Sequence, residues 1–118
     1  MDQACSGAAG MIAEGSVIVA YLQDPREKIF GLLLQLSQAG IVIRGMDLNA
    51  FHDWKQQRAR GEEAQVGPVT SFYPMHRIQR LELDETVGPI PSLSRSFMEE
   101  VGISAAEALR PNPSLEPL

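Results

Sequence analysis

The stretch of sequence that decides the fold is Glu27-Lys-Ile-Phe-Gly-Leu-Leu-Leu-Gln-Leu36. As a β-strand, it would carry an apolar side chain at every second position of one face, namely Phe30, Leu32, Leu34 and Leu36. Ile29 and Leu33 are apolar on the opposite face, so a strand here would be buried on both sides. Gly31 would then mark a bend, or a place where another backbone comes close.

The residues around this stretch also fit a helix. Asp24 can cap one, Pro25 suits the first helical position, and Gly40 can follow the last turn. Periodicity alone does not separate helix from strand over residues 25–40. The two structures imply different folds, a mainly antiparallel sheet or a βαβ unit.

Strands are predicted on both sides, over residues 16–22, 41–48, 68–73 and 76–83. Each of these segments is rich in β-branched residues or alternates apolar with polar ones. Gly45 predicts a bulge or tight curvature in the strand at 41–48. Pro74 separates the last two strands and predicts a sharp corner between them.

Three short helices are predicted. The first covers residues 49–58, with Asn49 as its cap and Phe51 and Trp54 on one face. The second starts at Ser92 or Ser94, runs through residue 100 and ends at Gly102. The third covers residues 104–109 and opens with a capping box.

Two stretches together resemble an Sm-like (SH3-like) small β-barrel. Residues 27–36 and 40–48 are similar to its long bent second strand and its third strand, with Gly31 at the usual glycine. Thr70-Ser-Phe-Tyr-Pro-Met-His-Arg-Ile-Gln-Arg-Leu-Glu-Leu83 is similar to the fourth strand, single-turn corner and fifth strand. The chain also resembles a small family of bacterial proteins of unknown function with a Phe/Tyr-Pro-Met-His-Arg motif and a Pro-Ser-Leu helical tail.

This resemblance implies an α+β fold that is mainly β, a five-stranded Sm-like barrel with added helices. Residues 1–15 would be a flexible leader, and 16–87 the barrel with an inserted helix near 49–58. Residues 88–110 would form a C-terminal helical extension and 111–118 a loose tail. The alternative is an ACT-like βαβ sandwich that binds a small regulatory molecule, which requires a helix over residues 27–38.

The barrel reading predicts a non-enzymatic interaction and assembly module. One apolar face of residues 27–36 would fill the barrel, and the other would be covered by the C-terminal helices or by a second subunit. Because edge strands of such barrels also pair between subunits, we expect a homo-oligomer.

The candidate partner-binding residues lie mostly at the Pro74 corner. In RNA-binding Sm-like proteins a Tyr-Lys-His run lines the nucleotide site, and here the matching residues are Pro74-Met75-His76. RNA binding through His76 and Arg77, with Tyr73 beside them, is therefore an alternative function, although the lysine is absent. Arg77, Arg80 and Arg44 could form a basic patch. A simpler expectation is that His76 ties down the corner and that the arginines pair with Glu82, Asp84 and Glu85.

Composition excludes several classes of protein. Ten basic and fifteen acidic residues give a net charge of −5, so we expect no DNA partner. One cysteine allows no internal disulfide, and the spacing of His and Cys residues indicates neither a metal site nor another cofactor. No nucleophile has a recognisable base, so we expect no enzyme. No apolar run is long enough to span a membrane, and residues 1–15 lack a secretory pattern, so we expect a cytoplasmic protein.

Overall fold

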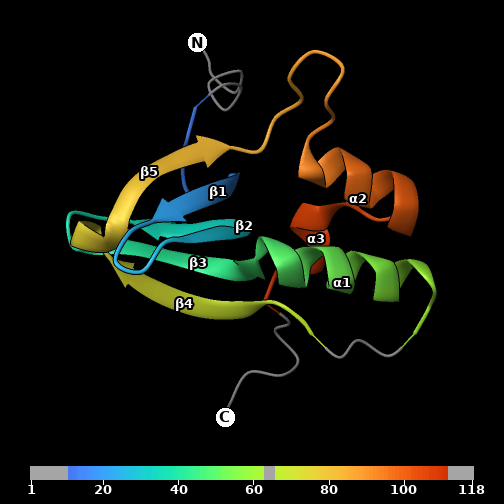
Figure 1. Cartoon of the computed structure of the whole chain (residues 1–118), viewed down its shortest axis with the longest axis horizontal. Coiled ribbons are helices and arrows are strands. Elements are labelled where there is room, and N and C mark those ends of the chain that lie inside the picture. Colours follow the sequence, from blue (N-terminus) through green and yellow to red (C-terminus); the bar gives the residue numbers. More distant parts are fainter. Residues whose placement is uncertain (1–10, 63–65, 112–118) are drawn as a thin grey trace.

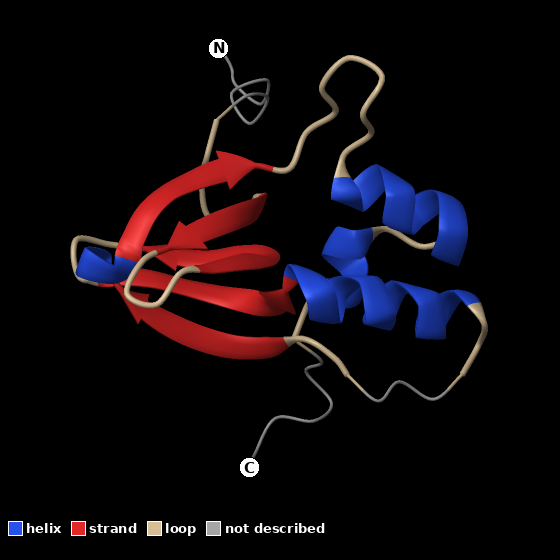
Figure 2. Cartoon of the chain, in the orientation of Figure 1, coloured by secondary structure: helices blue, strands red, loops and turns tan. Residues whose placement is uncertain are grey.

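The computed structural model describes residues 11–62 and 66–111 and shows an α+β fold. Five antiparallel strands form one sheet in the order β4-β3-β2-β1-β5 (Figures 1 and 2). The elements in chain order are β1 (Val17–Leu22), β2 (Glu27–Leu36), β3 (Gly40–Asp47), α1 (Leu48–Ala59), β4 (Val69–Pro74), the 3-10 turn η2 (Met75–Arg77), β5 (Ile78–Leu83), α2 (Leu93–Val101) and α3 (Ala105–Leu109).

The deciding stretch is a strand, with the bounds expected for the barrel reading. β2 pairs along its length with β1 on one side and with β3 on the other. The helical alternative over residues 25–40 is wrong, and with it the ACT-like βαβ arrangement. Asp24 and Pro25 lie instead in the turn between β1 and β2, where Asp24 adopts a positive φ of 55°. Pairing on both sides outweighs the local capping signals, because residues 29–33 of this strand are buried on both faces of the sheet.

Gly31 and Gly45 face each other across β2 and β3, at the point where the strands approach most closely. A Cβ built on Gly31 would lie 2.5 Å from the main-chain oxygen of Arg44, and one on Gly45 would overlap the main-chain oxygen of Phe30. The close approach expected at Gly31 is confirmed. The register also shifts between Leu33 and Gln35, which interrupts the pairing towards the end of β2.

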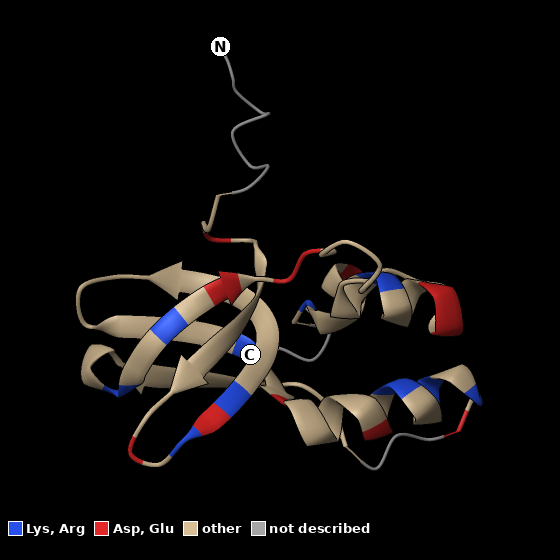
Figure 3. Cartoon of the chain, turned by 45° about the horizontal axis from the view of Figure 1, so that its top comes forward, with Lys and Arg blue, Asp and Glu red and all other residues tan. Residues whose placement is uncertain are grey.

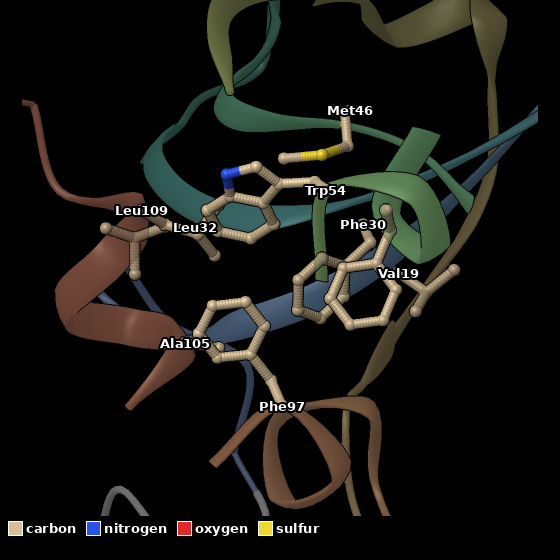
Figure 4. Close-up of a cluster of buried hydrophobic side chains, with 9 residues drawn as sticks. Val19, Phe30, Leu32, Met46, Trp54, Phe97, Ala105 and Leu109 are labelled. Atoms are coloured by element: carbon tan, nitrogen blue, oxygen red, sulfur yellow. The ribbon is translucent and has the colours of Figure 1, made fainter. Parts of the chain in front are cut away.

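Apolar side chains fill both faces of the sheet. One face carries a cluster from β1, β2 and β3, made of Ile18, Ala20, Leu22, Ile29, Leu33, Ile41 and Ile43. The other packs against the three helices and forms the cluster of Val19, Phe30, Leu32, Met46, Phe51, Trp54, Phe97, Ala105 and Leu109 (Figure 4). The helices of this same chain therefore cover the second face of β2, so that no second subunit is needed to bury it.

Trp54 and Phe97 join the helices to one another. Their rings stack with centroids 4.8 Å apart, and Phe51 packs against both. Trp54 therefore lies between sheet and helices and is buried with α2 and α3 (Figure 4).

The helix ends follow mostly from local sequence. Ser92 and Ser104 cap α2 and α3 as expected, and Gly102 ends α2 with a φ of 97°. Asn49 as the cap of α1 is wrong: Asp47 holds that position, and its side chain accepts a hydrogen bond from the Ala50 N–H. The chain leaves β3 directly into α1, so the last residue of the strand does the capping.

The sheet is strongly curved but is not closed by hydrogen bonds. β4 and β5 are its two outer strands, and the described residues show no pairing between them. They meet at one end, where η2 joins them, and diverge towards the helices (Figure 1). β5 begins at Ile78 rather than at His76, because residues 75–77 form the corner.

The predicted terminal segments are only partly described. Of residues 1–15, positions 11–15 are described, and the Gly15 N–H donates to the Leu33 main-chain oxygen at 2.7 Å. Leu33 N–H in turn donates to the Ser16 oxygen. Residues 1–10, with Cys5, and all of the predicted tail except Pro111 lie outside the described part.

Candidate functional site

The corner formed by η2 is held to the turn between β1 and β2 by Arg77. Its Nε donates to the Gln23 main-chain oxygen at 2.9 Å, and its Nη2 donates to the Pro25 oxygen at 2.7 Å. The same Nη2 lies 3.1 Å from the Glu27 carboxylate. The main chain adds a Gln23 N–H bond to the Arg77 oxygen at 2.8 Å. Arg77 therefore joins residues more than 50 positions apart in the sequence.

His76 and Tyr73 flank this arginine in different ways. His76 is exposed, and its main-chain oxygen accepts from the Gln23 side chain at 2.9 Å. The Arg77 guanidinium lies 5.9 Å from the centroid of the Tyr73 ring. Only 19% of the Arg77 side chain is exposed, so most of it is committed to the fold. This arrangement favours a structural role for the corner over phosphate recognition by Arg77.

The three arginines of the expected basic patch do not share one site. Arg44 lies on β3 on the helical side of the sheet and donates to the Thr70 hydroxyl at 3.2 Å, while its buried Nε has no hydrogen-bond partner among the described residues. Arg80 lies on β5, which is separated from β3 by two strands in the sheet order. Arg77 turns to the β1–β2 turn. The guanidiniums of Arg44, Arg77 and Arg80 therefore contact different groups, and these contacts do not themselves support one continuous patch.

The acidic partners expected for these arginines are only partly right. Glu82 accepts from the Arg80 Nε at 2.8 Å, and this hydrogen bond lowers the pKa of the Glu82 carboxyl below its ordinary value. Asp84 bonds instead to the N–H groups of Leu93 and Ser94, both at 2.7 Å. It thus caps α2 from the end of β5, since a carboxylate there satisfies unpaired amides of the first turn.

A groove lies between the outer end of the β2-β1-β5 sheet and the start of α1. It encloses about 840 Å³. Its lining residues come from four strands, the β1–β2 turn and α1: Tyr21, Leu22, Arg26, Glu27, Lys28, Asp47, Leu48, Asn49, His52, Gln79 and Arg80. Of the candidate residues from sequence, only Arg80 lies here. Figure 3 shows basic and acidic residues alternating along the start of β2 and along β5.

Tyr21 is the centre of this groove and was not a candidate from sequence. It pairs with Lys28 of β2 on one side and with Arg80 of β5 on the other, so the three side chains form one row across the sheet. The Lys28 Nζ is 5.6 Å and the Arg80 guanidinium 3.9 Å from the ring centroid. Only the register of β1 with its two neighbours reveals this row.

A smaller cavity of about 230 Å³ opens beside Gly45, where β2 and β3 pack closely. Tyr73 reaches it together with Ser71, Glu27 and Asp47. Both carboxylates already have partners, Glu27 in Arg77 and Asp47 in the Ala50 N–H. The part of the chain that the structure describes holds no cluster of three metal-binding side chains, and none of its helices is long and apolar enough to cross a membrane.

Comparisons with known proteins return no match. No family model, no curated protein and no solved structure is similar to this chain.

Proposed function

We propose that this chain is a non-enzymatic assembly module built on an Sm-like barrel, and that copies of it join through the free edge of β4. The barrel reading is supported by the sheet order, the bent second strand with its glycine, and the single turn between the last two strands. The curved sheet would be a partly open barrel whose interior is the cluster around Ile18 and Leu33.

The observation that carries the proposal is the character of β4. It pairs only with β3 among the described strands, and it contains no charged residue. Val69 and Phe72 are 59% and 55% exposed, although both are large and apolar. Natural edge strands are usually protected by charges, bulges or a covering element. An uncharged, apolar edge is suited to pairing with another strand.

The second free edge, β5, supplies a partner of a different kind. It pairs only with β1 among the described strands and carries Arg80 and Glu82. Pairing of β4 in one copy with β5 in the next would use two different surfaces. Such a head-to-tail contact generates a closed ring if the rotation closes. Because the helices cover the second face of the sheet, the edges of β4 and β5 remain as surfaces for assembly.

Replacing Phe72 by lysine is expected to convert the assembly to monomers. The charge would stand beside the side chains of an incoming strand on the same face of the sheet, where its desolvation opposes pairing. Because the Phe72 side chain is more than half exposed, the monomer fold should remain. Size-exclusion chromatography with light scattering over a concentration series measures the mass of each species.

The matched control is Ile90→Lys, since Ile90 is 66% exposed and lies outside the sheet. This variant should assemble like the unmodified chain. Assembly through β4 is contradicted if the unmodified chain stays monomeric at the highest concentration. It is also contradicted if the Phe72→Lys variant has the same mass in solution as the control.

A further inference from the structure

A groove between Tyr21 and α1 lies away from the β4 edge and gathers several polar and basic residues. Its volume of about 840 Å³ falls within the usual range for sites of small molecules. The sheet provides one wall through Lys28, Tyr21 and Arg80, and α1 provides the other through Asn49 and His52. Basic side chains therefore reach it from the β1–β2 turn, from two strands and from a helix.

The row Lys28–Tyr21–Arg80 holds two cations close together. Lys28 and Arg80 lie on β2 and β5, on either side of β1, and the Tyr21 ring of β1 lies between them in the row. The ring attracts both, with Lys28 and Arg80 each within 6 Å of its centroid. Arg80 donates through its Nε to Glu82, and its guanidinium also interacts with the Tyr21 side chain. The Arg80 side chain is nevertheless 51% exposed, so part of it remains open to the groove.

The remaining cations of the groove have no carboxylate partner. Within residues 11–62 and 66–111, neither Arg26 nor Lys28 forms an ion pair. The two acids of the lining are already engaged, since Glu27 contacts Arg77 and Asp47 caps α1. Arg26 and Lys28 therefore bring positive charge to one concave surface of a chain of net charge −5, where Glu82 of β5 lies near enough to Lys28 to offset part of it.

The start of α1 adds donors to the same space. Leu48 and Asn49 are its first two residues, and main-chain N–H groups there have no partner within the helix. The Asp47 side chain accepts a hydrogen bond from the Ala50 N–H, so this bond satisfies neither the Leu48 N–H nor the Asn49 N–H. The positive end of the helix dipole reinforces the charge of Arg26 and Lys28.

We propose that this groove binds a small molecule through a multiply charged phosphate group, such as a diphosphate. Arg26, Lys28 and Arg80 supply the charged donors on the sheet side. Asn49 and His52 contact the same group from α1. A small ligand fits better than a nucleic acid, because the acidic chain as a whole repels a long polyanion while a local cluster attracts a compact one.

The test uses the full chain and inorganic pyrophosphate as the probe. Calorimetric titration at low salt measures the dissociation constant, and amide chemical shifts locate the contact. Shifts are expected at Tyr21, Lys28, Leu48, Asn49 and Arg80, on the two walls of the groove. The double variant Arg26→Ala with Lys28→Ala should bind at least about tenfold more weakly, because two charged donors are lost.

The matched control removes two exposed arginines elsewhere, Arg60→Ala with Arg95→Ala. Both are more than half exposed and lie at the end of α1 and on α2. The control should bind within about twofold of the unmodified chain, since distant exposed charges are screened. Equal weakening in both double variants, or no binding of pyrophosphate, overturns the proposal.

Two further probes define the ligand class. Citrate that binds as tightly as pyrophosphate would overturn the preference for phosphate. A single-stranded RNA oligonucleotide that binds more tightly, with shifts extending to Tyr73 and His76, would overturn the small-molecule assignment and point to the corner. Amide spectra of each variant without ligand check that the fold is retained. We expect it to be, because Arg26 and Lys28 form no ion pair with another described residue.

Discussion

Gly45→Ala is expected to prevent this chain from folding. The added Cβ would overlap the main-chain oxygen of Phe30 and meet the Cα of Gly31 at 2.6 Å. Both obstacles are backbone atoms of a central strand, so neither can move without breaking the pairing of β2 with β3. A loss beyond about 4 kcal/mol is expected, against a total of about 5–15 kcal/mol for a domain. Far-UV circular dichroism and thermal unfolding measure the outcome.

The control for this substitution is Gly67→Ala. Nothing lies within 4 Å of a Cβ built there, and its φ is not positive. This variant should melt close to the unmodified chain. Gly31→Ala should behave like Gly45→Ala, because its Cβ meets the Arg44 main-chain oxygen at 2.5 Å. A melting temperature of Gly45→Ala within a few degrees of that of Gly67→Ala would show that β2 and β3 do not approach each other as closely at Gly45 as described.

Arg77→Ala is expected to lower the free energy of unfolding by about 1–3 kcal/mol, because it removes three charge-assisted contacts of a side chain that is only 19% exposed. The main-chain oxygens of Gln23 and Pro25 lose their donor, and Glu27 loses its cation. Arg77→Lys should recover only part of the loss, since an ammonium cannot span the same acceptors. Urea unfolding, read as a midpoint shift at constant slope, measures the change.

Arg95→Ala is the control, because Arg95 forms an exposed pair with Glu99 one helical turn away. Such pairs contribute about 0.3–0.5 kcal/mol. Equal stability of the Arg77→Ala and Arg95→Ala variants would show that the corner does not depend on Arg77. The stability of the Arg77→Ala variant also determines what a loss of RNA binding in that variant would mean. If the substitution unfolds the corner, weaker RNA binding does not indicate that Arg77 contacts a phosphate.

Local sequence predicted those parts of the fold that depend on neighbours in the chain. Ser92, Gly102 and Ser104 bound α2 and α3 because caps act within one turn. The same rule failed at Asp24 and Pro25, where helical signals flank a strand. There the pairing with two neighbouring strands decides the structure, and that information lies outside the segment.

The candidate site was harder to predict, because its contacts join distant segments. His76 and Arg77 were found from the corner, but their partners Gln23, Pro25 and Glu27 are more than 45 residues away. The row of Lys28, Tyr21 and Arg80 depends on two registers at once. An alternation of Arg80 with Glu82 along β5 indicated only a solvated strand. The available sequence signal was that Tyr21 and Lys28 lie at matching distances before and after the β1–β2 turn, which predicts that they pair across it.

The order of the elements has a consequence for how the protein forms on the ribosome. All five strands are complete at Leu83, whereas α2 and α3 follow at residues 93–109. When β5 leaves the exit tunnel, α1 can already cover part of Phe30 and Met46, but Phe97 and Leu109 are still inside the tunnel. The nascent sheet therefore shows an uncovered apolar surface to chaperones until the last helices emerge.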